Sequence, residues 1–318
     1  MTRRESAGTM GATPIRKSAK RARVKETRRT ASLLGPLRAE MRLAALPALV
    51  LGVLVAAAAV TRAVLLYLDG ANRGVNGLDK SILALDTPAG ALQAAAWQHS
   101  SLLGLLFVAL IGGVVLAEGL EGGTWSLVRL YQARVFLLVV RKLLIVLFLA
   151  ALSVIFTAVT LWAAVHLSQA LQPPAGPVND LLPAGQASQE SLRQLPDWGK
   201  AWEAYAKALL VLSFFATFTA CAAAAARAVI TGAVLGAGPV AVTLPLVTTD
   251  FRAWMPHYWI ASWMEFSEDG QWKLYWWSAS PGSPNSSTAL AVLSLVGVVL
   301  LSATWLLLRT ERSLSPRA

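Results

Sequence analysis

Residues 136–167 read FLLVVRKLLIVLFLAALSVIFTAVTLWAAVHL, and this stretch decides the fold class. Its only formal charges are Arg141 and Lys142, close to its start. A helix rises about 1.5 Å per residue, so about 20 apolar residues cross the roughly 30 Å hydrocarbon core of a bilayer. The stretch lacks the polar face of a helix that packs on a soluble core. It therefore predicts a membrane-spanning helix.

The composition of the whole chain also indicates a membrane protein. Of its 318 residues, 56% are apolar and 14% are charged, and the mean hydropathy is +0.56. Soluble domains have about 45–50% apolar and about 25% charged residues. The first apolar run is too long for a signal peptide and is interpreted as a retained span. We expect an all-α integral membrane protein of about six transmembrane helices in one domain over 33–318, with spans at about 43–68, 97–117, 136–167, 205–226, 228–248 and 288–308.

The amino-terminal segment is strongly basic. Residues 1–42 hold twelve of the 28 Lys and Arg residues and three acids, while the whole chain has a formal charge of +11. Next to a span, such charge indicates a cytoplasmic location and attraction to anionic lipid rather than nucleic-acid binding. Residues 1–32 are predicted to be a disordered cytoplasmic tail. Residues 33–42, with Arg38, Glu40 and Arg42, are predicted to form a helix on the inner membrane surface.

The distribution of positive charge predicts the orientation of the spans. With the amino end inside, the inner side collects twenty Lys and Arg residues and the outer side eight. The inner region 118–142 alone has four, against two in the outer loop 69–96. Both comparisons follow the positive-inside rule. We expect a multi-pass protein of the cell (inner or plasma) membrane with both termini in the cytoplasm.

Small residues predict how some spans pack. Gly232 and Gly236 have GxxxG spacing, and five alanines follow Cys221 in the preceding span. Such residues allow close approach of helix backbones in lipid. Arg227 alone separates these two spans, which predicts a tight turn. The single cysteine, Cys221, is interpreted as a packing residue, because it has no partner for an internal disulfide.

The chain lacks the common motifs of enzymes. GxSxG and HExxH are absent, and residues 74–81 resemble a P-loop but lack its Gly–Lys pair. His99 and His166 are interpreted as polar residues at outer helix ends. No catalytic, cofactor-binding or metal-binding residue is predicted. The span centres are nearly free of charge, which argues against a proton relay and fits a lipophilic cargo.

The segment EGLEGGTWSLVR, residues 118–129, is the most informative cytoplasmic stretch. Its glycines are expected to end the second span at about residue 117, and Thr124 or Ser126 can cap a new short helix. Arg129 and Arg134 would then project from this helix into the cytoplasm. The residues alone leave two interpretations open, a docking surface for a partner and an ordinary solvated loop.

This arrangement resembles the segment after the second span in ABC-2 type transporter permeases. The shared features are an acid, glycines, Gly-Thr, apolar residues, an Arg, and then Arg-Lys opening a span. The charged stretch before the first span and the six-span plan with a tight turn are similar to the same family. The resemblance implies that residues 118–135 form a coupling helix that contacts a separate ATP-hydrolysing subunit. The residues implied in this contact are Glu118, Glu121, Gly122, Gly123, Thr124, Arg129 and Arg134.

The resemblance also implies two permease copies, identical or homologous, around one pathway. ATP and Mg²⁺ are expected in the partner subunit, and this chain is expected to bind no cofactor. Residues 249–277 hold six tryptophans. They resemble a short outer re-entrant segment that members of this family carry before the last span, with Trp254, Trp259 and Trp263 as candidate residues. A plain aromatic belt at the membrane interface is the alternative interpretation.

These features predict a permease subunit that exports a lipophilic, drug-like or lipid-linked molecule and is not itself an enzyme. The long basic tail and the long outer loops depart from compact members of the family. Two other classes stay open. The first is a membrane anchor or assembly protein without transport, and the second is a membrane-embedded enzyme.

Overall fold

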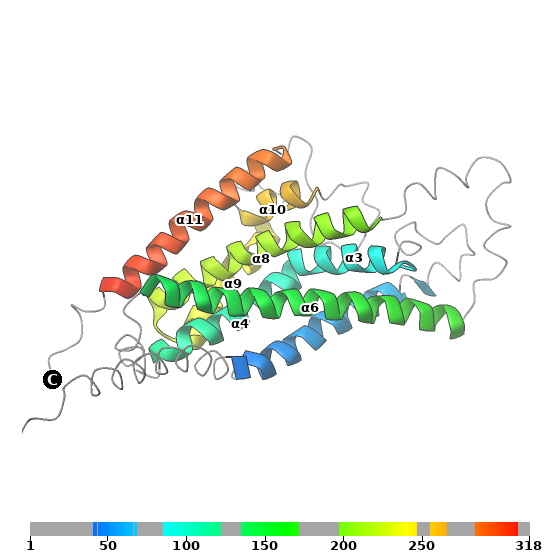
Figure 1. Cartoon of the computed structure of the whole chain (residues 1–318), viewed down its shortest axis with the longest axis horizontal. Coiled ribbons are helices and arrows are strands. Elements are labelled where there is room, and N and C mark those ends of the chain that lie inside the picture. Colours follow the sequence, from blue (N-terminus) through cyan, green and yellow to red (C-terminus); the bar gives the residue numbers. More distant parts are fainter. Residues whose placement is uncertain are drawn as a thin grey trace, which may run out of the picture. The chain divides into compact units, whose positions relative to one another are not determined.

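The computed structural model describes residues 41–42, 44–65, 67–68, 85–121, 135–171, 197–246, 255–265 and 284–310. Regular structure in these residues is α-helical throughout, without strands, which confirms the predicted class. The helices are Ala44–Leu65, α3 (Pro88–Ser100), α4 (Leu102–Glu121), α6 (Val135–Leu171), α8 (Trp198–Ala226), α9 (Val229–Leu246), α10 (Pro256–Met264) and α11 (Ser286–Thr310) (Figure 1).

Four helices of the described chain are long and apolar enough to cross a membrane, namely Ala44–Leu65, α6, α8 and α11. The pair α3 and α4 meets the same test as one broken span, which gives a fifth. The apolar stretch of α9, Val229–Pro239, is shorter. By length and composition the described residues therefore contain four or five candidate spans of a multi-pass helical membrane protein.

Helix α8 lies at the centre of the bundle. It contacts α3, α4, α6, α9, α10 and α11. Asp197 caps its start by accepting a hydrogen bond from the Lys200 amide at 2.7 Å. Its buried positions are rich in alanine, which lets several neighbours approach the same helix, and they include Ala201, Ala204, Ala208, Ala216, Ala220 and Ala223.

The turn between α8 and α9 is as tight as the sequence predicts. Helix α8 ends at Ala226 and α9 begins at Val229. Between them Arg227 adopts a left-handed conformation with φ of 56°, and its amide donates to the Ala223 carbonyl at 2.9 Å. This capping geometry reverses the chain and lays α9 against α8.

Glycines allow α4, α8 and α9 to pack closely. A Cβ atom added at Gly232 of α9 would lie 2.8 Å from the Cα atom of Ala223 in α8. One added at Gly113 of α4 would lie 2.8 Å from the Cβ atom of Ala233 in α9. Gly236 approaches α8 as closely. The glycines that the sequence marks for packing therefore face α8, and Gly113 adds α4 to the same seam.

The expected outer loop over 69–96 is wrong for its last part, because α3 already begins at Pro88. Thr87 caps this helix by accepting a hydrogen bond from the Gly90 amide at 3.0 Å, and Pro88 takes the first helical position. Helix α3 ends at Ser100, and at Ser101 the axis bends by 64° into α4. The segment expected to form the second span is therefore two helices rather than one.

The expected boundary between the second span and the charged segment is also corrected. Helix α4 continues to Glu121, so residues 118–121 are helical rather than part of a loop. Residues 122–134 lie outside the described residues, and so do the tail over 1–32, Arg38 and Glu40. Arg42 is helical and exposed.

Candidate functional site

A short helix lies inside the tryptophan-rich segment that the sequence singles out. Helix α10 starts with Pro256 at its first position and ends at Glu265, which has a left-handed φ of 57°. It carries Trp259 and Trp263, while Trp254 lies outside the described residues. Helix α10 contacts α8 and α11, and Figure 1 shows it between them.

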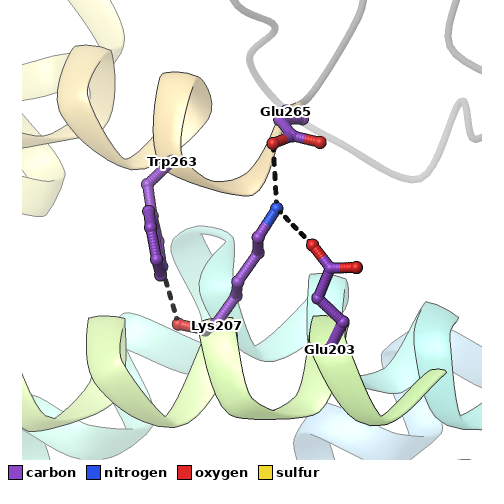
Figure 2. A network of polar contacts seen from close by, with 4 residues as sticks. All are labelled: Glu203, Lys207, Trp263 and Glu265. Carbon is purple, nitrogen blue, oxygen red and sulfur yellow. Dashed lines mark hydrogen bonds and ion pairs between the residues drawn. The ribbon is translucent and has the colours of Figure 1, made fainter. Parts of the chain in front are cut away.

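The end of α10 is held on α8 by an ionic contact (Figure 2). The Lys207 ammonium of α8 lies 3.0 Å from a carboxylate oxygen of Glu265 and 2.9 Å from one of Glu203. The Lys207 side chain is only 13% exposed, whereas the two glutamates are 62% and 63% exposed. Glu203 lies one turn before Lys207 on the same helix, so of these two ion pairs only the one with Glu265 joins two helices.

Trp263 strengthens the same junction. Its indole N–H donates to the Lys207 main-chain carbonyl at 3.1 Å, and its ring centroid lies 5.5 Å from the Lys207 ammonium. That distance is within the range of a cation–π contact. We call Glu203, Lys207, Trp263 and Glu265 the α10 clasp. It fixes the carboxyl end of α10 to α8 by one main-chain hydrogen bond and one side-chain ion pair.

Further along α8 from the clasp, this helix forms one wall of a cavity of about 920 Å³. Phe214, Phe215 and Phe218 line it from α8, and Pro239 lines it from α9. Phe214 lies two helical turns from Lys207, so the cavity and the clasp occupy neighbouring parts of the same helix. The wall presents aromatic faces and edges.

Helices α10 and α11 supply the rest of the wall. Helix α10 contributes Met255, Pro256 and Trp259, and α11 contributes one face that includes Leu293 and Val296. Among the described residues, the side chains that line the cavity are apolar apart from the indole N–H of Trp259. Trp259, a predicted site residue, is thus part of the cavity, and Trp263 belongs to the clasp that holds the same helix.

The break between α3 and α4 buries a histidine, which corrects the prediction that His99 is an interfacial residue. His99 is 0% exposed, and its Nδ1 lies 2.9 Å from the Ala95 carbonyl, to which it must donate. Nε2 is then the acceptor and receives the Ser153 hydroxyl hydrogen at 3.0 Å. Ser153 lies 54 residues away in α6, so the bond ties α3 to α6.

A serine that donates to a histidine is also the arrangement of a nucleophile and its base. Ser153, however, lies in the middle of α6, where neighbouring main-chain N–H groups are engaged in helical hydrogen bonds. Those groups are therefore not free to form an oxyanion hole, which acyl transfer requires. The pair is best interpreted as a tether between two helices. His166, in contrast, is partly exposed and lies 3.6 Å from Asp86.

The charged segment after α4 is located only in part. Glu118 and Glu121 lie on the last turn of α4, while Gly122, Gly123, Thr124, Arg129 and Arg134 fall outside the described residues. Lys142, near the start of α6, is buried and donates to the main-chain carbonyl of Val115 in α4. This bond lies next to the end of α4 that leads into the charged segment.

Within the described residues, no cluster of three or more His, Cys, Asp or Glu side chains is placed to hold a metal ion. Comparison of the chain with protein-family models, with curated proteins and with solved structures finds no match.

Proposed function

We propose that the chain is the membrane-spanning subunit of an ATP-driven transporter of the ABC-2 type. In this proposal six spans place both termini in the cytoplasm, and α10 is the outer re-entrant element before the last span. The chain exports a lipophilic, drug-like or lipid-linked molecule. A separate subunit binds ATP with Mg²⁺ and hydrolyses it, and a second permease copy completes the pathway.

The observation that carries this proposal is the position of α4. Its carboxyl end leads directly into the charged segment at 122–134, and its body packs on both α8 and α9. Those two helices supply the inner wall of the apolar cavity. A displacement of the charged segment by a partner would therefore reach the cavity through directly packed helices, as coupling between sites requires.

Lys142 supports the same path. Its ammonium group is buried and bonds to a carbonyl of α4 close to the charged segment. A charge buried without a partner is costly, so this bond favours common movement of α4 and α6. The inner ends of two spans are thereby joined where a partner subunit would push.

The coupling role of the charged segment is tested by charge reversal. The variant Arg129→Glu with Arg134→Glu is expected to recover much less ATP-binding subunit and to lose stimulation of its ATPase activity. The reason is that two reversed charges turn attraction into repulsion at a docking surface. The measurement is the amount and the ATPase activity of the subunit that co-purifies with the tagged chain.

Two controls keep this experiment specific. Arg129→Lys with Arg134→Lys retains both charges and should retain partner binding. Arg73→Glu makes the same chemical change on the predicted outer side and should have no effect. If the double reversal binds and stimulates the ATPase as the unchanged chain does, the coupling assignment is wrong.

A further inference from the structure

The cavity below the α10 clasp has a deep wall and an open rim. The deep wall includes Phe215 and Leu293, which are 1% and 3% exposed. The rim includes Val296 of α11, which is 40% exposed. Both side chains line the cavity and have almost no surface open elsewhere, so a molecule next to them must lie in the cavity.

The lining determines what kind of molecule fits. Among its described residues the lining offers no polar group beyond the indole N–H of Trp259. Water gains little in such a cavity, and apolar cavities stay dry unless an apolar molecule fills them. An empty space would also deprive the surrounding side chains of dispersion contacts. A volume of about 920 Å³ is near the upper end of the roughly 300–1,000 Å³ of small-molecule sites. The described lining thus fits a large hydrocarbon group and offers no partner to a charged one.

The position of the rim indicates where that group comes from. Helix α11 is the least buried of the four long candidate spans, with 11% of its most apolar window buried. Around the rim, Leu295, Val298 and Val299 are exposed apolar residues on the same helix. With α11 as a membrane span, this exposed apolar surface lies at the depth of the lipid hydrocarbon. We propose that the cavity binds one hydrocarbon chain, which enters sideways from the bilayer beside α11.

The inference deepens the proposed function, and its meaning for transport rests on that function. A lipid-linked or lipophilic cargo would place its hydrocarbon part in this cavity while α10, held by the clasp, covers it. The binding itself depends on this chain alone and is measured without ATP or a partner subunit.

The test uses photocrosslinking of the purified full-length chain in phosphatidylcholine nanodiscs. One sample contains phosphatidylcholine with a diazirine in one acyl chain, and a second contains a free fatty acid with the same group. After illumination, mass spectrometry locates the adducts. Adducts on Phe215 and Leu293 are the expected result, because only a chain inside the cavity reaches them. Whichever probe gives these adducts identifies the source of the chain.

Two matched variants of α11 complete the test. Val296→Trp fills the rim and should abolish the adducts on Phe215 and Leu293. Val298→Trp introduces the same side chain two residues away, at a position 62% exposed and outside the cavity lining, and should leave them unchanged. Size-exclusion chromatography confirms that both variants are folded.

Two results would overturn the inference. One is labelling that is confined to lipid-facing residues such as Leu295, with Phe215 and Leu293 unlabelled. The other is an equal loss of labelling in both tryptophan variants. Either result would leave the transport proposal standing, since that proposal is tested by partner capture. A failed capture would in turn leave the chain-binding result unaffected.

Discussion

The α10 clasp predicts how firmly α10 is held over the cavity. In the variant Lys207→Met the side-chain stem is retained and the ammonium group is lost. The ion pair to Glu265 and the contact with the Trp263 ring disappear together. The hydrogen bond from the Trp263 indole to the main chain remains, because its acceptor is the carbonyl oxygen. Helix α10 should therefore open more often without detaching permanently.

The size of the effect follows from these contacts. Because Glu265 is largely exposed, its ion pair contributes about 0.2–1 kcal/mol. The cation–π contact adds about 0.5–1 kcal/mol at a site of this kind. The two together give about 0.7–2 kcal/mol, which corresponds to about a 3- to 30-fold increase in the opening of α10. Glu203→Gln removes only an ion pair within α8 and should change this opening little.

Hydrogen exchange measures this opening directly. The amides of residues 260–264 in α10 are followed in nanodiscs for the unchanged chain and for both variants. Faster exchange in Lys207→Met, with Glu203→Gln close to the unchanged chain, is the predicted pattern. If Lys207→Met exchanges at the original rate, or if both variants accelerate exchange equally, Lys207 does not hold α10 through Glu265 and Trp263.

Two further predictions concern packing between spans. The first is a double-mutant cycle of His99→Leu and Ser153→Ala, with the free energy of unfolding measured in detergent. The expected coupling energy is about 0.6 kcal/mol and at most about 1.7 kcal/mol, as found for hydrogen bonds between membrane helices. A coupling energy of zero would exclude the tether. Gly113→Ala should lower stability by about 1–3 kcal/mol, because the new methyl group would lie 2.8 Å from Ala233. Gly238→Ala meets nothing within 4 Å and should change stability by less than about 0.5 kcal/mol, so equal thermal shifts of the two variants would contradict the close packing of α4 on α9.

The apolar spans could be predicted because bilayer thickness imposes a minimum length on each of them. The first, third, fourth and sixth expected spans have long helical counterparts in Ala44–Leu65, α6, α8 and α11. The start of α3 was missed because residues 88–96 are rich in alanine and contain Gln93, which weakens an apolar signal. Thr87 followed by Pro88 is a helix-start signature that would have located it.

The interior contacts could not be predicted in the same way. His99 lies next to two serines, which indicates a polar helix end. Its burial depends on the packing of α6 against α3, which brings Ser153 to it from a distant part of the chain. For the clasp, the spacing of Glu203 and Lys207 is a local signal. The partner on α10 becomes apparent only once that helix is folded onto α8.

The site itself was predicted in part. Tryptophan enrichment directed attention to the segment that contains α10, because indole rings favour the membrane interface. It gave no indication of the phenylalanine wall on α8, since apolar residues in a span are expected whether or not they line a cavity. The charged residues at 122–134 still stand as a sequence-based prediction.

The most direct test of the account is to capture the tagged chain from cells in mild detergent and to identify every chain that co-purifies. A stoichiometric ATP-binding subunit, with its ATPase activity recovered in the complex, is the expected result. A clean preparation without such a subunit, repeated after crosslinking in the cells, would contradict it and would favour a membrane anchor or a membrane-embedded enzyme.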